Sequence, residues 1–492
     1  MSKVGEGSHA AVSRPRPVAR ELLPGLVISA ATPVLVLLAN PPVGVWPLIF
    51  VAFVPMLVAQ HRVLPARESW LAPAIGIGGS YAVYFSPGLA DGEVALVYQF
   101  LPLYVAVLAA LLAGRSRWFA ERTGHRWFVL SAPLAWTAVD FIRSTGSETI
   151  GGTWGFHAYA LHAHPALLQP VSVFGITGLQ LLILLTSWAL AGLALRGRAA
   201  LRGALVVGVL LVSWATASTL MMDEAPPTVR VAAVQNGLPN TDELADARLE
   251  RYVDQTRDAA EEGAQLVVWN EAGLRFDPQR EHTEELVALA AETDAYLVIG
   301  YLIEESDGRT RNATTVLAPN GEFLGIYGKD HPGTFAGDIN DFQGDFPVYD
   351  TELGPLATII CYDLDFTDTA RTMTRRGARL IAAPSSDVSA IATTHYTHLV
   401  FRAIENRVSM VKADSRFDSA IIDPWGRVVA STVDPEGETR ATLVADVPLG
   451  SGRSPWVTFG DWFGWLTVAG TVAFSLLGVM LRLKARGLVN RG

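Results

Sequence analysis

The chain has 492 residues, of which 50% are hydrophobic and only 17% are charged. A soluble protein of this length typically carries about 25% charged residues, so the composition disfavours a purely soluble protein, and the net charge of −10 argues against nucleic acid as a partner. The single cysteine, Cys361, excludes an internal disulfide and any zinc site that needs two cysteines.

The charges divide the chain into two chemically different parts. Residues 223–453 hold 39 acidic and 20 basic residues, whereas the rest of the chain holds 9 acidic and 18 basic residues. An acidic, polar block is therefore inserted into an apolar, basic remainder. The first 20 residues of that remainder are expected to be disordered.

Long apolar runs occupy most of the remainder and predict membrane helices. A membrane-spanning helix needs roughly 20 apolar residues, and most of the runs meet that length. A signal peptide is the alternative interpretation of the first run, but the seven runs that follow favour membrane spans. We therefore expect about seven spans within residues 21–222 and a final span over 457–482. The runs lie at about 22–39, 43–60, 70–88, 93–113, 127–142, 166–195, 202–222 and 457–481.

The basic residues predict the orientation of these spans. If eight spans start from a cytoplasmic N-terminus, the inner segments contain 17 Lys and Arg residues, and the short outer loops contain one, Arg143. Basic residues are retained on the cytoplasmic side of a membrane. We therefore expect residues 1–20 and the basic tail 483–492 in the cytoplasm, and the block 223–456 outside it.

The block 223–456 alternates between strand-like and helix-like segments, which predicts an α/β domain whose helices cover its sheets. The segment 314–329 reads as two strands around an Asn-Gly turn. Further strands are expected at 229–235, 266–270, 295–303, 357–361, 379–385, 408–413 and 418–423, and helices at 242–262, 284–293, 369–378 and 396–407.

Three reactive side chains stand at the ends of predicted strands. Cys361 ends one strand, and the amides of a helix that begins soon after it would stabilise a thiolate. Glu271 directly follows a buried strand, where apolar surroundings suit a general base. Lys329, one of four lysines, ends a third strand, and its ammonium would stabilise a thiolate or an oxyanion.

Each of these residues also has an ordinary interpretation. Cys361 would be a buried inert thiol, Glu271 a solvated loop residue and Lys329 a surface residue at a strand end. The combination is more specific than its parts, because it offers a base, an electrophile and a nucleophile from three strand ends.

The segments around these residues resemble the three signature segments of the nitrilase, or carbon–nitrogen hydrolase, superfamily. They are WNEAGL (269–274), YGKDHP (327–332) and ICYDLDF (360–366). The resemblance implies an α-β-β-α sandwich with Glu271 as general base and Cys361 as nucleophile. It also implies roles for three neighbours: Lys329 would stabilise the tetrahedral intermediate, the backbone N–H of Tyr362 would donate to its oxyanion, and Asp363 stands where the family has Glu.

The membrane part narrows the resemblance. A nitrilase-like domain between a seventh and an eighth span resembles the layout of bacterial apolipoprotein N-acyltransferases, and residues 151–185 resemble that family's region around its sixth span. Just outside that span, Trp154 and Phe156 are expected at the membrane interface, where they would guide acyl chains. His331 is a further candidate for substrate contact.

Several positions depart from the family's pattern. Asn270 stands where Pro usually precedes the catalytic Glu, and Gly337 falls where a second glutamate is expected, which leaves Asp338 as its nearby substitute. The interval from Lys329 to Cys361 is short for the family. The usual Ser-Asn-Asp run appears only as Ser-Ser-Asp within 385–389.

The resemblance implies an acyltransferase of the bacterial cell membrane that needs no cofactor and no metal. It would move a fatty acyl chain from a phospholipid, through a Cys thioester, to the N-terminal diacylglyceryl-cysteine of a lipoprotein. The main alternative is a membrane-anchored carbon–nitrogen hydrolase or acyltransferase acting on another amide, amine or lipid. A transporter or receptor, which would need polar groups deep in its spans, and a catalytically inactive lipid-binding homologue are also considered.

Overall fold

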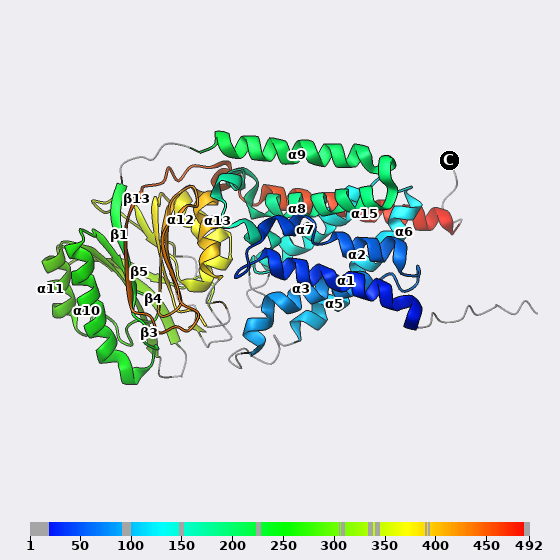
Figure 1. Cartoon of the computed structure of the whole chain (residues 1–492). Helices are drawn as coiled ribbons and strands as arrows, with labels where there is room; N and C mark the ends of the chain where they lie inside the picture. The colour runs from blue at the N-terminus through cyan, green and yellow to red at the C-terminus, as the bar shows by residue number, and fades with distance from the viewer. Residues whose placement is uncertain are drawn as a thin grey trace, which may run out of the picture.

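The computed structural model describes residues 19–90, 100–146, 152–222, 228–304, 306, 310–332, 338–339, 345–388, 391 and 394–486. A layer of long helices occupies one end of the molecule and an α/β domain the other (Figure 1). Of the first 20 residues, which were expected to be disordered, residues 1–18 lie outside the described residues, whereas Ala19 and Arg20 begin α1 and correct the expectation.

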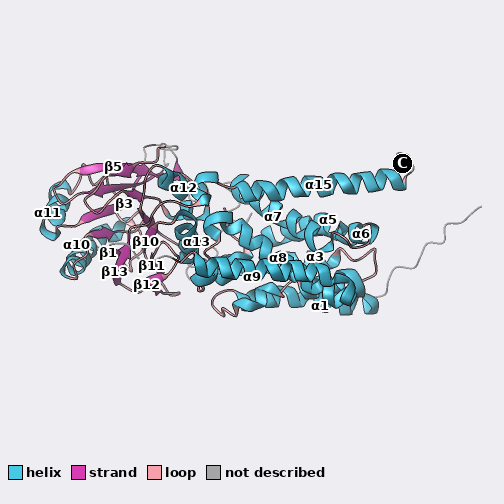
Figure 2. Ribbon diagram, turned by 90° about the horizontal axis from the view of Figure 1, so that it is seen from above, coloured by secondary structure: helices cyan, strands magenta, loops and turns pink. Residues whose placement is uncertain are grey.

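The helical part is built from long, apolar helices that pack side by side (Figures 1 and 2). α1, α3 and α5 pack in one group and α7, α8, α9 and α15 in another, and the short α2, which contacts both α1 and α8, joins the two groups. These helices are α1 (Ala19–Ala39), α3 (Leu71–Ala90), α5 (Leu101–Leu112), α7 (Phe128–Gly146), α8 (Val171–Arg196), α9 (Leu201–Leu220) and α15 (Trp462–Ala485), with the shorter α2 (Val54–Val58) and α6 (Ser116–Arg122) between them.

Five helical stretches of the described residues are long and apolar enough to cross a membrane: 20–39, 46–63, 103–122, 171–220 and 462–485. The stretch 171–220 contains both α8 and α9. Most large exposed hydrophobic side chains, such as Val209, Val212 and Leu476, lie on these stretches, as expected for side chains that face lipid. The chain is therefore a membrane protein.

Two of the expected spans are less regular than their sequences predict. The run over 43–60 forms a 3-10 helix at Trp46–Phe50, then α2, then a π-helical turn at Ala59–Val63. The run over 166–195 starts as a helix only at Val171 and is interrupted at Gly175, which has φ +66°. A Cβ atom at Gly175 would collide with the Trp456 ring, so close packing and a left-handed backbone both require glycine there.

The α/β domain is a sandwich of two mixed sheets. The first has the order β13-β1-β2-β3-β4-β5, with β6 also paired to β4, and the second has the order β12-β11-β10-β9-β8-β7. The strands of the first sheet are β1 (Thr228–Gln235), β2 (Leu266–Val268), β3 (Tyr296–Glu304), β4 (Thr310–Leu317), β5 (Phe323–Gly328), β6 (Asp338–Ile339) and β13 (Ala441–Pro448). Those of the second are β7 (Val348–Tyr349), β8 (Leu356–Thr358), β9 (Leu380–Ser385), β10 (Ser409–Asp414), β11 (Asp418–Ile422) and β12 (Val428–Val433).

Apolar residues on both faces of each sheet give the domain four layers. One buried cluster joins the inner faces of the two sheets, through residues such as Val231, Val298, Leu380 and Val411. A second cluster packs α10 (Ala245–Glu261) and α11 (Thr283–Thr293) on the outer face of the first sheet. On the outer face of the second sheet lie α12 (Asp368–Arg375) and α13 (Tyr396–Asn406). The expected α-β-β-α sandwich is confirmed.

The layer that contains α12 and α13 faces the membrane helices (Figure 1). The Glu405 carboxylate on α13 accepts a hydrogen bond from the Ile176 amide just after the interruption of α8 (2.9 Å), and Arg407 donates to Gln169 (2.5 Å). The Thr153 amide donates to the Asp365 carbonyl (2.8 Å), which lies in the turn after the cysteine. The membrane part therefore contacts the segment that carries Cys361.

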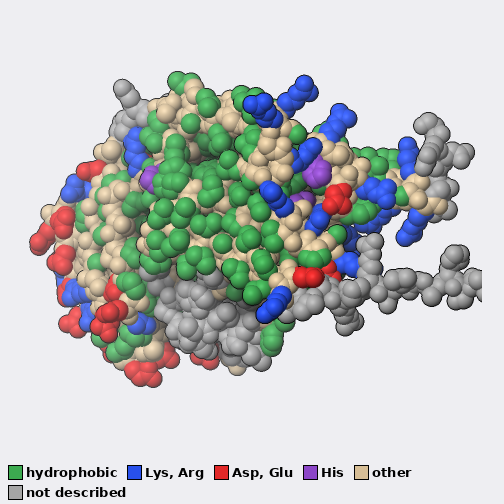
Figure 3. Space-filling model, turned by 45° about the vertical axis from the view of Figure 1, so that its right-hand side comes forward, with side chains coloured by type: hydrophobic (Ala, Val, Ile, Leu, Met, Phe, Trp, Pro, Cys, Tyr) green, Lys and Arg blue, Asp and Glu red, His purple; other side chains and the backbone are tan. Residues whose placement is uncertain are grey.

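The charges separate along the molecule as the sequence indicates. On the face shown in Figure 3, hydrophobic side chains cover the middle, acidic side chains gather over the α/β end, and Lys and Arg side chains gather over the helical end. An apolar band between two charged ends matches a protein that crosses a membrane.

Candidate active site

Glu271 is positioned by the central strands of the first sheet. β2 pairs in parallel with β1 and β3, and the Trp269 amide extends the pairing by donating to the Val298 carbonyl (2.9 Å). Asn270, where Pro is expected, fixes the turn because its side chain donates to the Glu271 carbonyl (2.8 Å) and accepts a hydrogen bond from the Tyr252 hydroxyl. Glu271 is thereby held, nearly buried, at the carboxyl end of a buried strand.

Lys329 reaches Glu271 from the edge strand of the same sheet. It follows β5, and its amide continues the β4–β5 pairing by donating to the Asn312 carbonyl (3.1 Å). Its Nζ lies 2.7 Å from Glu271 Oε1, and both side chains are 6% exposed. Glu271 accepts two further hydrogen bonds, from Asn312 Nδ2 to Oε1 (2.6 Å) and from the Ser386 amide to Oε2 (3.0 Å). The predicted base and the predicted electrophile are therefore one buried ion pair.

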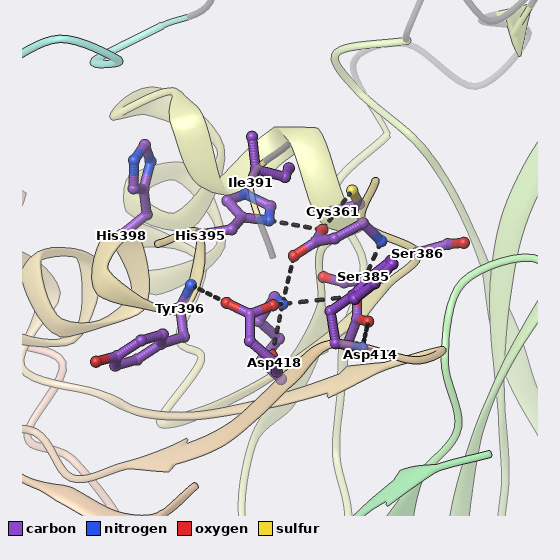
Figure 4. Close-up of polar contacts among 12 residues, drawn as sticks. Cys361, Ser385, Ser386, Ile391, His395, Tyr396, His398, Asp414 and Asp418 are labelled. Atoms are coloured by element: carbon purple, nitrogen blue, oxygen red, sulfur yellow. Dashed lines mark hydrogen bonds and ion pairs between the residues drawn. The ribbon is translucent and has the colours of Figure 1, made fainter. Parts of the chain in front are cut away.

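Cys361 lies in a strained turn after β8. Its φ is +42°, which is rare for a residue with a Cβ atom, and it begins a 3-10 helix that spans Cys361–Asp365. Such strain at a nucleophile presents the side chain away from the strand it follows. The Cys361 Sγ lies 3.6 Å from Asp387 Oδ1 (Figure 4).

The environment of Cys361 differs from the expectation that helix amides stabilise a thiolate. The next α-helix, α12, begins only at Asp368. Burial raises the pKa of the Cys361 thiol well above its usual range, and the charge of Glu271 adds to that increase, whereas Lys329 opposes it. The expectation was wrong because the thiol is buried between carboxylates. Cys361 is therefore a protonated thiol at neutral pH, and it would need a base to act as the predicted nucleophile.

Tyr362 and Asp363 follow the nucleophile in the same 3-10 helix. The Tyr362 ring packs edge-to-face on Phe366, at 5.1 Å between centroids. Asp363 is fully buried, and burial raises its pKa to about 6. It accepts hydrogen bonds from the Tyr327 hydroxyl (2.7 Å) and from the amides of Ile360 and His331 (both 2.8 Å). Asp363 thus links the turn that carries Cys361 to the end of β5 and to His331, which flank Lys329 in the chain.

His331 lies beside Asp363, to which its amide donates. Its ring stacks on Phe366, with centroids 3.7 Å apart, and its Nε2 lies 3.2 Å from Asp368 Oδ1. Burial opposes its charge, but Asp368 and Asp363 outweigh burial and raise the pKa of His331 to about 9. At neutral pH His331 is therefore positively charged and lies beside Asp368, the first residue of α12. Its contact with a substrate remains a prediction.

Trp154 and Phe156 are both buried, whereas the sequence suggested the membrane interface. The Trp154 ring lies over the imidazoles of α13, 4.4 Å from His398 and 5.8 Å from His395 between centroids. Phe156 lies beneath Arg143, whose guanidinium carbon is 5.9 Å from the ring centroid. Both rings pack in the junction between the membrane part and the α/β domain, which the sequence cannot show.

Asp338, the candidate substitute for a second glutamate, lies in β6, where it pairs with Thr310 of β4. Its side chain and Gly337 lie outside the described residues. The structure therefore leaves the role of Asp338 a prediction.

A second group of polar residues around the thiol was missed by sequence reasoning. Asp387 contacts His395 Nδ1 (2.7 Å) and Lys412 Nζ (2.7 Å), and Lys412 also contacts Asp418 and Asp414. All five side chains are buried. Two weak signals pointed here: the Ser-Ser-Asp run that contains Asp387, and Lys412 as one of only four lysines.

This second group resembles a cation site, but its cation is a side chain. Oxygens of Asp387, Asp414 and Asp418 lie close enough to share a metal ion. The Lys412 ammonium already lies among them, within 2.7 Å of Asp387 and 3.6 Å of Asp414. A buried lysine that contacts three carboxylates supplies the positive charge that this site requires.

Comparisons with known proteins match both parts of the chain. A family model for the apolipoprotein N-acyltransferase N-terminal domain matches residues 33–189, and a carbon-nitrogen hydrolase model matches residues 230–454. An apolipoprotein N-acyltransferase of Geobacter metallireducens is 27% identical over 501 residues, which cover 90% of this chain and 93% of the relative. One of Gloeobacter violaceus is 27% identical over 500 residues, which cover 90% and 91%. Among solved structures, an amidase from Nesterenkonia sp. is 22% identical and covers 46% of this chain and 92% of its own, with a TM-score of 0.39.

Proposed function

Because the chain belongs to the apolipoprotein N-acyltransferase family, we propose that it transfers a fatty acyl chain from a membrane phospholipid to the N-terminal amine of diacylglyceryl-cysteine in bacterial lipoproteins. The observation that carries the proposal is the buried Glu271–Lys329 ion pair beside the Cys361 thiol, in a domain joined to apolar helices at both ends. We place the enzyme in the bacterial cell membrane, with the α/β domain outside the cytoplasm.

In the first half-reaction the Cys361 thiol attacks the carbonyl carbon of the donor ester. The S–H proton passes to Glu271 while the C–S bond forms. The carbonyl oxygen of the ester becomes an oxyanion, which Lys329 and the Tyr362 amide stabilise. Collapse breaks the C–O bond, and the lysophospholipid leaves with the proton from Glu271. A thioester remains on Cys361.

In the second half-reaction the neutral amine of the acceptor attacks the thioester. A C–N bond forms, Glu271 takes the proton that the amine loses, and the C–S bond breaks. The thiolate leaves and receives that proton, which restores the resting thiol. Two steps through a covalent intermediate predict ping-pong kinetics. This chemistry uses only side chains and a backbone amide of the chain.

The test is to trap the thioester without an acceptor. Purified protein is incubated with phospholipid labelled in its acyl chain, and we expect label that survives denaturation and is released by neutral hydroxylamine. Since Cys361 is the single cysteine, Cys361→Ser removes every thioester site, and this variant should take up no label. Glu271→Gln should reduce the labelling strongly.

Two outcomes would contradict the proposal. If the wild type never labels but releases ammonia from small amides, the chain is a membrane-anchored carbon–nitrogen hydrolase. If it does neither, Glu271, Lys329 and Cys361 are not catalytic and the protein only binds lipid. Mass spectrometry of lipoprotein N-termini, with and without the protein, then identifies the acceptor.

A further inference from the structure

A second carboxylate lies at the nucleophile. Asp387 follows β9, and its Oδ1 lies 3.6 Å from Cys361 Sγ and 2.7 Å from His395 Nδ1. Its Oδ2 accepts from Lys412 Nζ (2.7 Å), and its amide donates to Asp414 Oδ2 (2.9 Å). Figure 4 shows Cys361, His395, Asp414 and Asp418 gathered around this position. Asp387 is thus fixed in position from several sides.

Among the described residues, the hydrogen-bond acceptor recorded for the Cys361 thiol is Asp387 Oδ1, at 3.6 Å from Sγ. The oxygens of Glu271 already accept from Lys329, Asn312 and the Ser386 amide. Because a thiol carries one proton, the described arrangement places that proton on the Asp387 side of the sulfur. The predicted general base therefore does not hold the proton that it must remove.

The charges around Asp387 keep it ionised. Burial disfavours its charge, but His395 and Lys412 outweigh burial and hold the pKa of Asp387 well below its usual range. Asp414 and Asp418 also face this group, with carboxylate oxygens within 4.8 Å of an Asp387 oxygen. Burial raises the pKa of both, which limits the negative charge that they place beside Asp387. An ionised carboxylate beside a thiol favours S–H over thiolate, because like charges repel.

We propose that Asp387 is a second active-site carboxylate, which holds Cys361 as a protonated thiol between turnovers. When the donor ester binds, the thiol turns to Glu271. The inference rests on the proposed role of Cys361 as nucleophile. When the donor binds, the S–H···Asp387 hydrogen bond breaks and the proton passes to Glu271 as the C–S bond forms. When the acceptor leaves, the restored thiol donates to Asp387 again.

His395 and Lys412 act through Asp387 and are positioning residues. His395 Nδ1 and Lys412 Nζ each hold one of its oxygens, so the carboxylate cannot rotate away from the sulfur. The arrangement also protects the enzyme, because thiols oxidise in proportion to their thiolate character. In an oxidising compartment, a thiol that stays protonated until the ester binds is oxidised more slowly.

The test measures the reactivity of Cys361 without any lipid. Iodoacetamide alkylates the thiolate form, and the chain has no other cysteine to react. The alkylation rate of the detergent-solubilised full chain is measured against pH for wild type and Asp387→Asn. The control Asp446→Asn removes the same charge from an exposed residue, which pairs with Arg230 on the first sheet.

We expect Asp387→Asn to be alkylated about 10-fold faster than wild type at pH 7.5, since removing one neighbouring negative charge lowers a pKa by about one unit or more. The midpoint of its pH profile should fall accordingly, and acyl transfer should fall at least 10-fold because the thiol is no longer held. Asp446→Asn should match the wild type in both measurements. Because burial raises the pKa of Cys361, a loss of structure would also speed alkylation and slow turnover, so the comparison counts only for variants whose thermal unfolding temperature matches that of the wild type.

Equal or slower alkylation of folded Asp387→Asn would overturn the proposal. Thermal unfolding of each variant establishes whether it is folded, and Asp387→Ser replaces the Asn variant if that fails to fold. Failure of both to fold would also overturn it, because Asp387 would then serve the fold and not the thiol. None of these results depends on lipid, so they are separate from the thioester test of the proposed function.

Discussion

At the scale of single residues, the Glu271–Lys329 pair carries a prediction. Lys329→Arg keeps the charge but replaces a compact ammonium with a larger planar group. In a pair with both side chains nearly buried and Nζ 2.7 Å from Oε1, the guanidinium does not fit without moving Glu271. We expect acyl transfer to fall at least 100-fold, since loss of one oxyanion donor typically costs about 10²–10³ in rate.

Lys484→Arg is the matched control, because Lys484 lies in the exposed last turn of α15. It should transfer acyl chains like the wild type when both variants are assayed with the same donor and acceptor. A Lys329→Arg variant within a few-fold of the wild type would show that Lys329 does not touch the reacting groups.

The sequence predicts these reactive residues better than their partners. Glu271, Lys329 and Cys361 each stand at a strand end that hydrophobic patterning reveals, and the structure brings charge from the first two onto the thiol of the third. Asn312 and Asp387, which hold Glu271 and Cys361, are polar residues on other strands or loops. The pairing of β3 with β4 and of β8 with β9 brings them to the site, and patterning along one strand carries no information about pairing across a sheet.

At the scale of elements, the close approach of β3 to the end of β2 carries the next prediction. Gly300 lies in β3, and a Cβ atom there would collide with the Asn270 carbonyl oxygen and lie 3.0 Å from Glu271 Cα. Because these neighbours are backbone atoms, they cannot rotate aside. We expect Gly300→Ala to displace Glu271, to reduce thioester formation at least 10-fold and to lower the thermal unfolding temperature.

Gly208→Ala in α9 is the comparison, because no atom outside its own helix lies within 4 Å of the added Cβ. Alanine also favours a helix interior over glycine by about 1 kcal/mol, so this variant should unfold at the same or a slightly higher temperature. Wild-type labelling by Gly300→Ala would mean that the β2 turn tolerates displacement of Glu271.

The differences between expected and observed elements have a common cause. The strand expected to reach Cys361 ends at Thr358, and a 3-10 helix follows in place of an early α-helix. Asp363 makes this turn by accepting from the amide of Ile360, three residues before it. In α8, the interruption at Gly175 accommodates the Trp456 ring, which comes from far along the chain. In both cases a specific side chain, Asp363 in the turn and Trp456 against α8, decides where the regular element is interrupted, and hydrophobic patterning does not show such a contact.

At the scale of the whole molecule, the two ends of the helical part differ: one adjoins the acidic α/β domain, and the other holds basic residues and the outer ends of α1 and α15. The N-terminal end of α1 and the C-terminal end of α15 lie at the end of the layer remote from the α/β domain (Figure 1). Arg482 and Lys484 stand in the last turn of α15, the link between α8 and α9 carries Arg198, and Arg202 lies at the start of α9. The sequence predicted this separation from composition alone, because the arginine-rich loops and the acidic block alternate with the apolar runs.

The last prediction is that the α/β domain faces the outside of the cell and that both termini face the cytoplasm. Retention of basic residues on the inner side is its physical basis. Single cysteines are introduced into Cys361→Ser at three exposed positions: Pro435 in the α/β domain, Arg202 at the start of α9 and Arg486 after α15. Intact cells are then treated with a maleimide that does not cross membranes. We expect Pro435→Cys to be labelled, and Arg202→Cys and Arg486→Cys to be labelled only after the cells are opened. Labelling of all three in intact cells, or of Arg202→Cys and Pro435→Cys from the same side, would contradict the orientation. Labelling of Pro435→Cys only after the cells are opened would place the α/β domain in the cytoplasm. This outcome bears on the proposed function, because a lipid-linked acceptor can reach Cys361 only from the side that the α/β domain faces.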